Sequence, residues 1–168
     1  DKLLHTDMDE LREYFQISIT NTGNDLKIEV REKRKNNLLN WRNQISLNFE
    51  ILAPVKAACN LKAVDGDLSL NGFNGEQYSK TVDGDIKIQN IKGAVKASTT
   101  DGDISVRDIT GAVDLGTADG DIELKKIRGD VRMKVLDGDV QFDDLKGNIR
   151  CSIIDGDIFK YRYHHHFR

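Results

Sequence analysis

The tripeptide Asp-Gly-Asp occurs six times in this 168-residue sequence, and each copy begins 18 residues after the one before it. The copies stand at residues 65–67, 83–85, 101–103, 119–121, 137–139 and 155–157. A fixed period of this length is typical of a solenoid, in which one supersecondary unit stacks on the next. The period therefore constrains the architecture before any other feature is considered.

A glycine halfway between successive copies divides each repeat into two halves of nine residues. Apolar and polar residues alternate within each half, so that Ile86, Ile104 and Ile122 fall in one column of the aligned repeats. Alternation with a period of two predicts a short strand with one buried face, and glycine suits the corners between strands. Helical repeats are excluded, because two helices and their turns do not fit into such a unit.

We therefore predict an all-β fold, a right-handed parallel β-solenoid whose flattened coils of 18 residues form two facing sheets. Successive coils should lie ~4.8 Å apart. Ile104 is expected to point inward and Lys87 outward. The change Ile104→Asp should then destabilise the fold severely, because it buries an unpaired charge, whereas Lys87→Asp should cost little.

We expect the repeats to belong to one continuous domain with three segments. Residues 1–56 are interpreted as N-terminal strands and irregular early coils that cap the core, because an open end would expose apolar columns and strand edges. Residues 57–160 are the regular coils, and the pattern ends at Lys160, which falls in an otherwise apolar column. Residues 161–168 form an aromatic and basic tail.

Three segments before the repeats alternate as strands do. They are residues 15–20, 26–30 and 45–51, the last ending near Pro54, the only proline. Residues 57–64 are interpreted as a degenerate half-coil with Cys59, Leu61 and Ala63 in inward columns. We also expect a short helix within residues 1–14 and a loop at residues 31–43.

Composition narrows the classes of partner. The net charge is −3, so nothing indicates a nucleic-acid partner, and no run of 18 apolar residues indicates a membrane span. Cys59 and Cys151 should lie five coils apart, roughly 25 Å, against a limit of about 7 Å between bridged Cα atoms. We expect two free, buried thiols that act as small hydrophobes.

The repeats at residues 93–104 and 111–122 join Gly-Ala-Val to Asp-Gly-Asp-Ile half a coil later. In this combination the chain resembles bacterial adhesin-like β-solenoid domains of unknown function, over about residues 14–160. Many of those relatives carry Ser where this chain has Asp before Gly-Asp. The resemblance implies an exported protein of the periplasm, outer membrane or cell surface, with a protein or glycan partner that the sequence does not identify.

The Asp-Gly-Asp corner is the first candidate site. Stacked carboxylates about 5 Å apart repel by roughly 0.8 kcal/mol in water, so another interaction must offset the repulsion. Backbone hydrogen bonding with solvation is the favoured interpretation, and no cofactor is expected. Calcium is the alternative, although one acidic corner offers few oxygens. The calcium candidates are Asp83, Asp85, Asp101, Asp103, Asp119, Asp121, Asp137 and Asp139.

Two further groups of charged residues stand outside that corner. Lys92, Arg128 and Lys146 precede the mid-repeat glycines, so rods could associate edge to edge through one acidic and one basic side. A monomer with a mixed-sign surface is the other expectation. His164, His165 and His166 suggest a metal site or a remnant of a purification tag, but a solvated tail is favoured, because three adjacent histidines do not share one strand face.

No catalytic constellation is visible on the coils. The outward positions alternate small, acidic and basic residues, and Tyr78 is the main outward aromatic side chain on the regular coils. We therefore expect a non-catalytic bacterial envelope or surface scaffold, adhesin-like in its binding role. The alternatives are a calcium-binding module that uses the Asp-Gly-Asp corner and a self-assembling structural rod.

Overall fold

The structure, a computed structural model, describes residues 15–23, 25–33 and 47–161, and within them it contains strands and no helix. The chain divides into two compact units, Asp1–Glu50 and Ile51–Arg168. Each unit is considered by itself. The helix expected within residues 1–14 and the histidines 164–166 lie outside the described residues.

The described strands of the first unit form a β-hairpin. Strands β1 (Phe15–Thr22) and β2 (Asp25–Glu32) pair antiparallel, from Phe15 opposite Glu32 to Thr22 opposite Asp25. The two predicted strands are confirmed, but their interpretation as irregular coils is wrong. Only two residues separate them, and a parallel pair needs a crossover of about a dozen residues or more.

The strand predicted at residues 45–51 is not formed where the structure describes it. Residues 47–54 carry no strand, and residues 45–46 lie outside the described ranges. Phe49 and Leu52 are exposed, and the chain turns at Pro54, whose carbonyl accepts a hydrogen bond from the Ala57 N–H at 2.9 Å. Alternation favours a strand only when a partner supplies the ladder of hydrogen bonds, and no strand of the described residues pairs with this segment.

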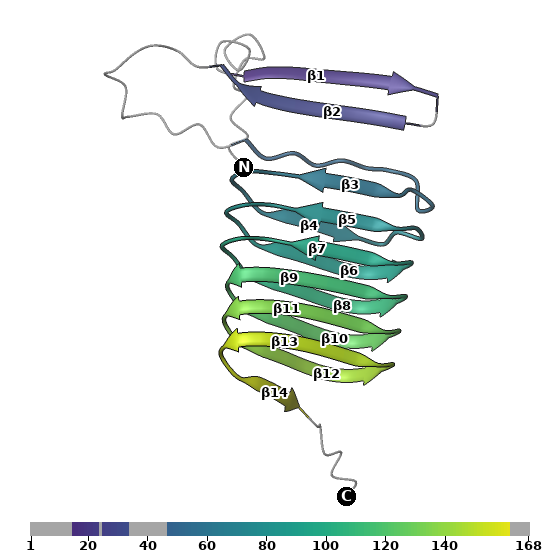
Figure 1. Cartoon of the computed structure of the whole chain (residues 1–168). Coiled ribbons are helices and arrows are strands. Elements are labelled where there is room, and N and C mark those ends of the chain that lie inside the picture. The colour runs from purple at the N-terminus through teal and green to yellow at the C-terminus, as the bar shows by residue number, and fades with distance from the viewer. Residues whose placement is uncertain (1–14, 24, 34–46, 162–168) are drawn as a thin grey trace, which may run out of the picture. The chain divides into compact units, whose positions relative to one another are not determined.

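The second unit is a stack of coils made by two six-stranded sheets (Figure 1). We name them the odd sheet, in the order β13-β11-β9-β7-β5-β3, and the even sheet, in the order β14-β12-β10-β8-β6-β4. Every neighbouring pair in both sheets is parallel. The odd strands are β3 (Cys59–Lys62), β5 (Gln77–Lys80), β7 (Val95–Ser98), β9 (Val113–Asp119), β11 (Val131–Asp137) and β13 (Ile149–Asp155). The even strands are β4 (Leu68–Asn71), β6 (Ile86–Lys92), β8 (Ile104–Thr110), β10 (Ile122–Arg128), β12 (Val140–Lys146) and β14 (Ile158–Tyr161).

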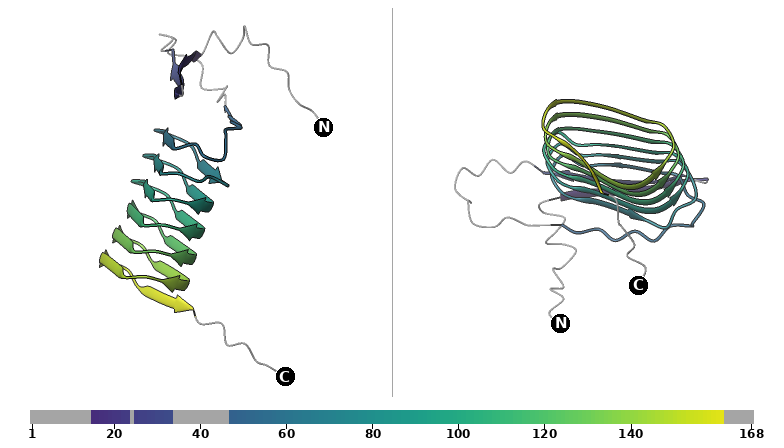
Figure 2. Two further views of the ribbon diagram at one scale, coloured as in Figure 1. Left: turned by 90° about the vertical axis from the view of Figure 1, so that its right-hand side faces the viewer. Right: turned by 90° about the horizontal axis from the view of Figure 1, so that it is seen from below.

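The register confirms that one coil takes 18 residues. Ile86 lies beside Ile104, Ile104 beside Ile122, and Ile122 beside Val140. The chain winds right-handed, and the coils superimpose as flattened loops when they are viewed along the stack (Figures 1 and 2). The predicted right-handed parallel β-solenoid is therefore confirmed.

The core lies between the two sheets and consists mainly of isoleucine, leucine and valine. Ile104 and Ile122 have exposed fractions of 0 %, because each is covered by the facing sheet and by the equivalent side chains one coil away. Lys87, between two buried residues of β6, is exposed. The inward and outward columns are thus those that the alternation predicts.

The corners that follow β5, β7 and β9 are closed by glycine and threonine. Gly102 has φ +137°, and a Cβ atom there would collide with the Gly84 carbonyl oxygen one coil away. The buried Thr99 hydroxyl lies inside the same corner. It donates a hydrogen bond to the carbonyl oxygen of Asp101 at 3.0 Å and also lies 3.2 Å from the carbonyl oxygen of Gly84. Thr81 and Thr117 make the equivalent contacts in the neighbouring coils.

A second ladder of bends interrupts the even strands. Asn90, Asp108, Lys126 and Asp144 all have φ between 51° and 55°, the left-handed region that non-glycine residues rarely adopt. The strand register skips these positions, since Gln89 pairs with Arg107 and Ile91 with Ile109. The bend at Asn90 thus allows both Ile88 and Ile91 of β6 to be buried in the core.

Candidate functional site

In five of the six Asp-Gly-Asp corners, the second aspartate accepts a hydrogen bond from the next coil. Oδ1 of Asp85 accepts a hydrogen bond from the Asp103 N–H at 2.9 Å, and Oδ1 of Asp103 accepts one from the Asp121 N–H at 2.8 Å. The same contact joins Asp67 to Asp85, Asp121 to Asp139 and Asp139 to Asp157. These bonds offset the repulsion between stacked carboxylates, since each backbone N–H places a positive dipole against a negative charge.

The calcium candidates form two lines rather than a cage. Asp83, Asp101, Asp119 and Asp137 are exposed, while Asp85, Asp103, Asp121 and Asp139 each have one oxygen engaged by a backbone N–H. Among the described residues, no three His, Cys, Asp or Glu side chains are grouped so that they could hold a metal ion. A cation at this corner would therefore draw on carboxylates from successive coils and on backbone carbonyls.

The basic residues before the mid-repeat glycines do not act as one group. Arg128 turns along the even sheet and contacts Asp144, with Nη2 at 2.7 Å from Oδ2 and Nη1 at 2.7 Å from the main-chain oxygen. This hydrogen bond is the main reason that the pKa of Asp144 lies below its usual value. Lys92 and Lys146 remain exposed.

Other charges on the even sheet also meet an opposite charge. The Asp108 carboxylate lies 3.6 Å from Nε of Arg107 and 3.7 Å from Nζ of Lys126. Exposed pairs of this kind contribute little to stability, about 0–1 kcal/mol each. These ion pairs affect binding more than stability, because a cation that already faces a carboxylate is less available to an external anion.

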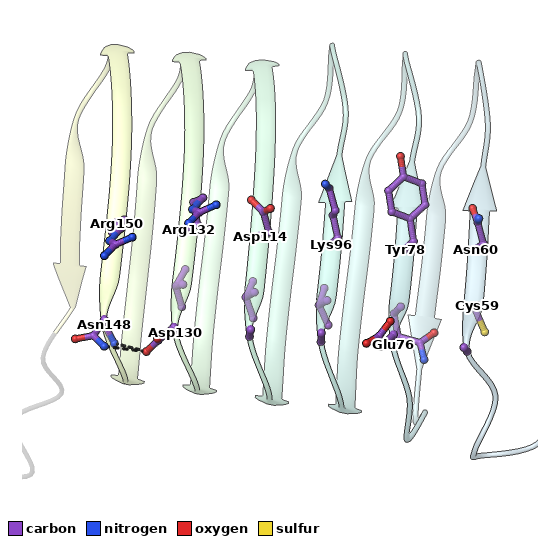
Figure 3. Close-up of a pocket in the computed structure, with 17 residues that line it drawn as sticks. Cys59, Asn60, Glu76, Tyr78, Lys96, Asp114, Asp130, Arg132, Asn148 and Arg150 are labelled. Atoms are coloured by element: carbon purple, nitrogen blue, oxygen red, sulfur yellow. Dashed lines mark hydrogen bonds between the residues drawn. The ribbon is translucent and has the colours of Figure 1, made fainter.

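A groove crosses the outward face of the odd sheet from β3 to β13 and has a volume of about 710 Å³ (Figure 3). We call it the odd-sheet groove. Part of its floor is made by alanines at the strand starts, Ala58, Ala94 and Ala112. Beside them runs a row of larger side chains with one member per coil, namely Asn60, Tyr78, Lys96, Asp114, Arg132 and Arg150.

A second hollow of about 490 Å³ adjoins the groove, where Gly116 and Ser98 leave the sheet surface low. Lys96, Arg132 and Lys134 surround it, together with Asp114. Lys96 and Arg132 occupy the positions opposite Asp114 in the two neighbouring strands, β7 and β11. Three cations and one carboxylate therefore meet around a hollow that has no bulky side chain.

The cations of the odd-sheet groove and of the adjoining hollow are exposed and belong to no ion pair among the described residues. Within the part of the chain that the structure describes, Lys96, Arg132, Lys134 and Arg150 form no ion pair within 4.0 Å. One of the groove carboxylates, Asp130, accepts hydrogen bonds from the backbone N–H and the side-chain amide of Asn148, at 3.0 and 3.1 Å. The groove lining carries three cations, Lys96, Arg132 and Arg150, and three carboxylates, Glu76, Asp114 and Asp130, so its formal charge is zero. Its basic part is the end at β11 and β13, where Arg132 and Arg150 lie beside each other in register.

Tyr78 lies in the groove as the outward aromatic residue that the sequence predicts. Its ring is half-buried, and the ammonium group of Lys62 stands over it at 5.7 Å from the ring centroid. A contact of this kind holds the ring in place by the attraction between a cation and the π face.

The two cysteines are free, as predicted, but they are half-buried rather than buried. Cys59 belongs to β3 and Cys151 to β13, the terminal strands of the odd sheet, so each has a neighbouring strand on one side only. Partial burial raises the pKa of both thiols. Neither thiol lies near the other, since four strands separate them.

The odd-sheet groove is not among the sites that the sequence predicts. Alternation places the side chains of Lys96, Asp114 and Arg132 outward, but the repeat does not say which outward charges find partners. The signal that was available is the combination of small residues, Ala58, Ala94, Ala112 and Gly116, beside basic ones at matching places in the repeats. Small residues on an exposed strand leave room that a ligand can fill.

A comparison with protein-family models matches residues 8–160 to the family described as Toastrack DUF4097. No curated protein and no solved structure matches the chain. No helix in the described ranges is long and apolar enough to cross a membrane. The match spans most of the sequence, and the name of the family agrees with a fold of stacked parallel coils. This chain therefore belongs to the Toastrack DUF4097 family.

Proposed function

We propose that the protein is a non-catalytic scaffold of the bacterial cell envelope or surface that presents the odd-sheet groove to a partner, in an adhesin-like role. The observation that carries the proposal is the difference between the two sheets. Arg128 of the even sheet meets Asp144 at 2.7 Å, whereas Arg132 and Arg150 of the odd sheet have no ion-pair partner in the described chain. Unpaired charges aligned on one face favour an external ligand of opposite charge.

The rigidity of the coils supports a scaffold role. The outward side chains are placed at intervals of ~4.8 Å by continuous parallel ladders. The core beneath them is closed, with Val95, Val113 and Val131 each 2 % exposed. A surface that is already ordered loses little conformational entropy when a ligand binds, so more of the contact energy is retained as affinity.

The exposure of the groove carboxylates supports binding rather than catalysis. General acid–base chemistry needs groups that converge in a pocket from which water is excluded. Glu76 and Asp130 are exposed on the open sheet, and Asp130 is engaged by Asn148 of the next coil. The contact between Asp130 and Asn148 serves the stacking of the coils.

The proposed location is tested by fractionation of the native bacterium. The protein should be found in the envelope or outside the cell, as the resemblance to adhesin-like domains implies. Recovery in the cytoplasmic fraction alone would contradict the proposal.

The proposed surface is tested by binding of purified protein to envelopes isolated from the same bacterium. The double variant Arg132→Glu/Arg150→Glu reverses two charges of the groove and should bind much less. The matched control, Lys87→Glu/Lys92→Glu, reverses two exposed charges of the even sheet and should bind like the wild type. Equal binding by the two double variants would show that the groove is not the binding surface.

Two other functions expected from the sequence have their own tests. Calorimetric uptake of calcium together with a raised melting temperature would favour a calcium-binding module at the Asp-Gly-Asp corner. A molecular mass that rises with protein concentration and falls with salt would favour a self-assembling rod. No contact in the described chain favours either function over the groove.

A further inference from the structure

We propose that the ligand of the odd-sheet groove is an acidic polysaccharide, a linear chain of sugar rings that bear carboxylates. The polymer lies along the stack and crosses the odd strands one after another. This inference rests on the proposed function and names the chemical class of its partner. The geometry, the charges and the uncharged surface of the groove each support it.

The geometry favours a straight polymer with a short repeat. The groove is lined from Cys59 in β3 to Arg150 in β13 and therefore crosses six strands, a length of roughly 25 Å. Its row of side chains repeats once per coil, at ~4.8 Å. One linked pyranose ring advances an extended polysaccharide by a similar length, so successive rings can meet equivalent positions of successive coils.

The charges favour carboxylates that are spaced along the polymer. Arg132 and Arg150 lie beside each other on β11 and β13, and each guanidinium can donate two parallel hydrogen bonds to one carboxylate. Asp114 interrupts the basic row one strand before Arg132 and repels an anion there. The lining has two further carboxylates, Glu76 in the coil of Tyr78 and Asp130, which accepts hydrogen bonds from Asn148. The groove therefore favours a carboxylate at Arg132 and Arg150 and disfavours one at Asp114.

The uncharged surface favours sugar rings between the carboxylates. The alanines Ala58, Ala94 and Ala112 leave a low apolar floor, and the half-buried Tyr78 ring stands at the edge of it. Sugar rings carry C–H groups on their faces, which pack against alanine methyl groups and aromatic rings. Their hydroxyl groups can bond to the side-chain amide of Asn60, which also lines the groove.

An acidic peptide fits this surface less well. Peptides that a β-sheet recognises usually add a strand at its edge and gain main-chain hydrogen bonds. The odd-sheet groove lies on the face of the sheet, where the backbone groups of β7, β9 and β11 already pair with one another. A peptide there would have side-chain contacts alone.

The experiment measures binding of three polymers to the purified chain by calorimetry, without divalent cations. The probes are polygalacturonate oligomers, neutral dextran and poly-L-glutamate. Polygalacturonate should bind at least about tenfold more tightly than either of the others, and its affinity should fall as salt rises from about 0.01 M to about 1 M.

Four variants locate the site on the groove. Arg132→Glu/Arg150→Glu should weaken polygalacturonate binding at least about tenfold, and Tyr78→Ala should weaken it by a smaller factor. Asp114→Asn should strengthen binding, because the repulsion at that position is removed. Lys87→Glu/Lys92→Glu on the even sheet should leave it unchanged. Thermal unfolding of each variant verifies that the solenoid is intact, and the gain expected for Asp114→Asn cannot come from misfolding.

Four results would overturn the inference. They are equal or tighter binding of poly-L-glutamate, equal binding of dextran, failure of polygalacturonate to bind, and equal losses in the two double variants. The proposed function fails separately. If polygalacturonate does not bind but envelope binding still depends on Arg132 and Arg150, the ligand class alone is wrong. If envelope binding is also insensitive to these residues, the proposed function is wrong as well.

Discussion

The central coils and the last coil place the same residue type in the same column with different results. Ile104 and Ile122 are 0 % exposed, whereas Ile158, one coil beyond Val140 in that column, is 54 % exposed. The central strands have a neighbour on each side, but within the described chain β14 pairs only with β12. Burial in this fold is therefore decided by the position of a coil in the stack as well as by the residue.

The corners also differ along the stack, here in whether a threonine hydroxyl is present. In the earlier coils Thr81, Thr99 and Thr117 donate hydrogen bonds to corner carbonyls. The equivalent positions nearer the C-terminus are Val135, which is buried, and Ile153, which is half-buried. The later corners therefore rely on apolar packing where the earlier ones add a hydroxyl. Four predictions can break or sharpen this comparison, from the largest expected effect to the smallest.

The change Ile104→Asp should lower the free energy of unfolding by at least about 4 kcal/mol, because it places an unpaired charge in the dry core. Ile158→Asp, in the same column at the exposed last strand, should cost about 1 kcal/mol or less. Lys87→Asp is the outward control and should also cost little. Urea unfolding followed by circular dichroism measures all three, and similar losses for Ile104→Asp and Ile158→Asp would refute the role of stack position.

Gly102→Ala should destabilise by about 2–3 kcal/mol, since the new methyl group meets the Gly84 carbonyl oxygen at a φ that alanine rarely adopts. Gly66→Ala tests the first corner, where φ is +122° but no atom lies within 4 Å of the added carbon. It should cost about 1 kcal/mol from backbone strain alone. Thermal unfolding compares the two variants, and an equal cost would mean that the clash between coils is relieved by small shifts.

Thr99→Val should cost about 1 kcal/mol, because the corner loses one hydrogen bond while the side-chain volume is kept. Val135→Thr is the reverse change two coils later. It should be neutral or slightly stabilising, since the equivalent carbonyl oxygens of Gly120 and Asp137 offer the new hydroxyl its acceptors. Chemical denaturation measures both variants. If the Thr99→Val protein is as stable as the wild type, the corner threonines contribute packing only.

The pair Arg128–Asp144 joins a central strand, β10, to β12 and provides a test of small magnitude. The pKa of Asp144 is lowered chiefly by the hydrogen bond from Arg128, so Arg128→Gln should raise it toward the ordinary value. Because the folded-state pKa is lowered, the stabilisation is present above the ordinary aspartate pKa and is lost as pH falls through the lowered one.

Carboxyl NMR titration of the folded protein measures the Asp144 shift, and Lys87→Gln is the control that should leave the Asp144 pKa unchanged. An Asp144 pKa that stays low in the Arg128→Gln protein would assign the effect to the other nearby cations, Lys126 and Lys146.

Much of the fold could be predicted because the repeat supplies its own alignment. The columns of Ile104 and Lys87 follow from alternation within one repeat, and stacking follows from its recurrence. The hairpin could not be recognised in the same way, because Phe15–Thr22 and Asp25–Glu32 alternate equally well in parallel and antiparallel pairs. The short connection between them was the signal that decides the pairing.

The left-handed bends and the candidate site were harder to predict for different reasons. Asparagine and aspartate, as at Asn90 and Asp108, are residue types that tolerate the left-handed region. Lysine is not such a residue type, although Lys126 adopts that region here. From the sequence, the column therefore looks like an ordinary polar surface. The odd-sheet groove depends on whether Arg132 or Arg128 finds a carboxylate. Long side chains choose their partners in three dimensions, and a period in sequence does not report that choice.

The hydrogen bond that the second aspartate of an Asp-Gly-Asp corner accepts from the backbone N–H of the following coil also determines how such a chain can change in length. Loss or gain of a single residue within a coil would displace Asp103 from the amide of Asp121 and turn every later side chain to the opposite face. Duplication of a whole 18-residue unit would instead lengthen the rod by one layer and leave all earlier contacts intact. The solenoid can therefore be extended or shortened by whole coils without disturbing the coils that remain.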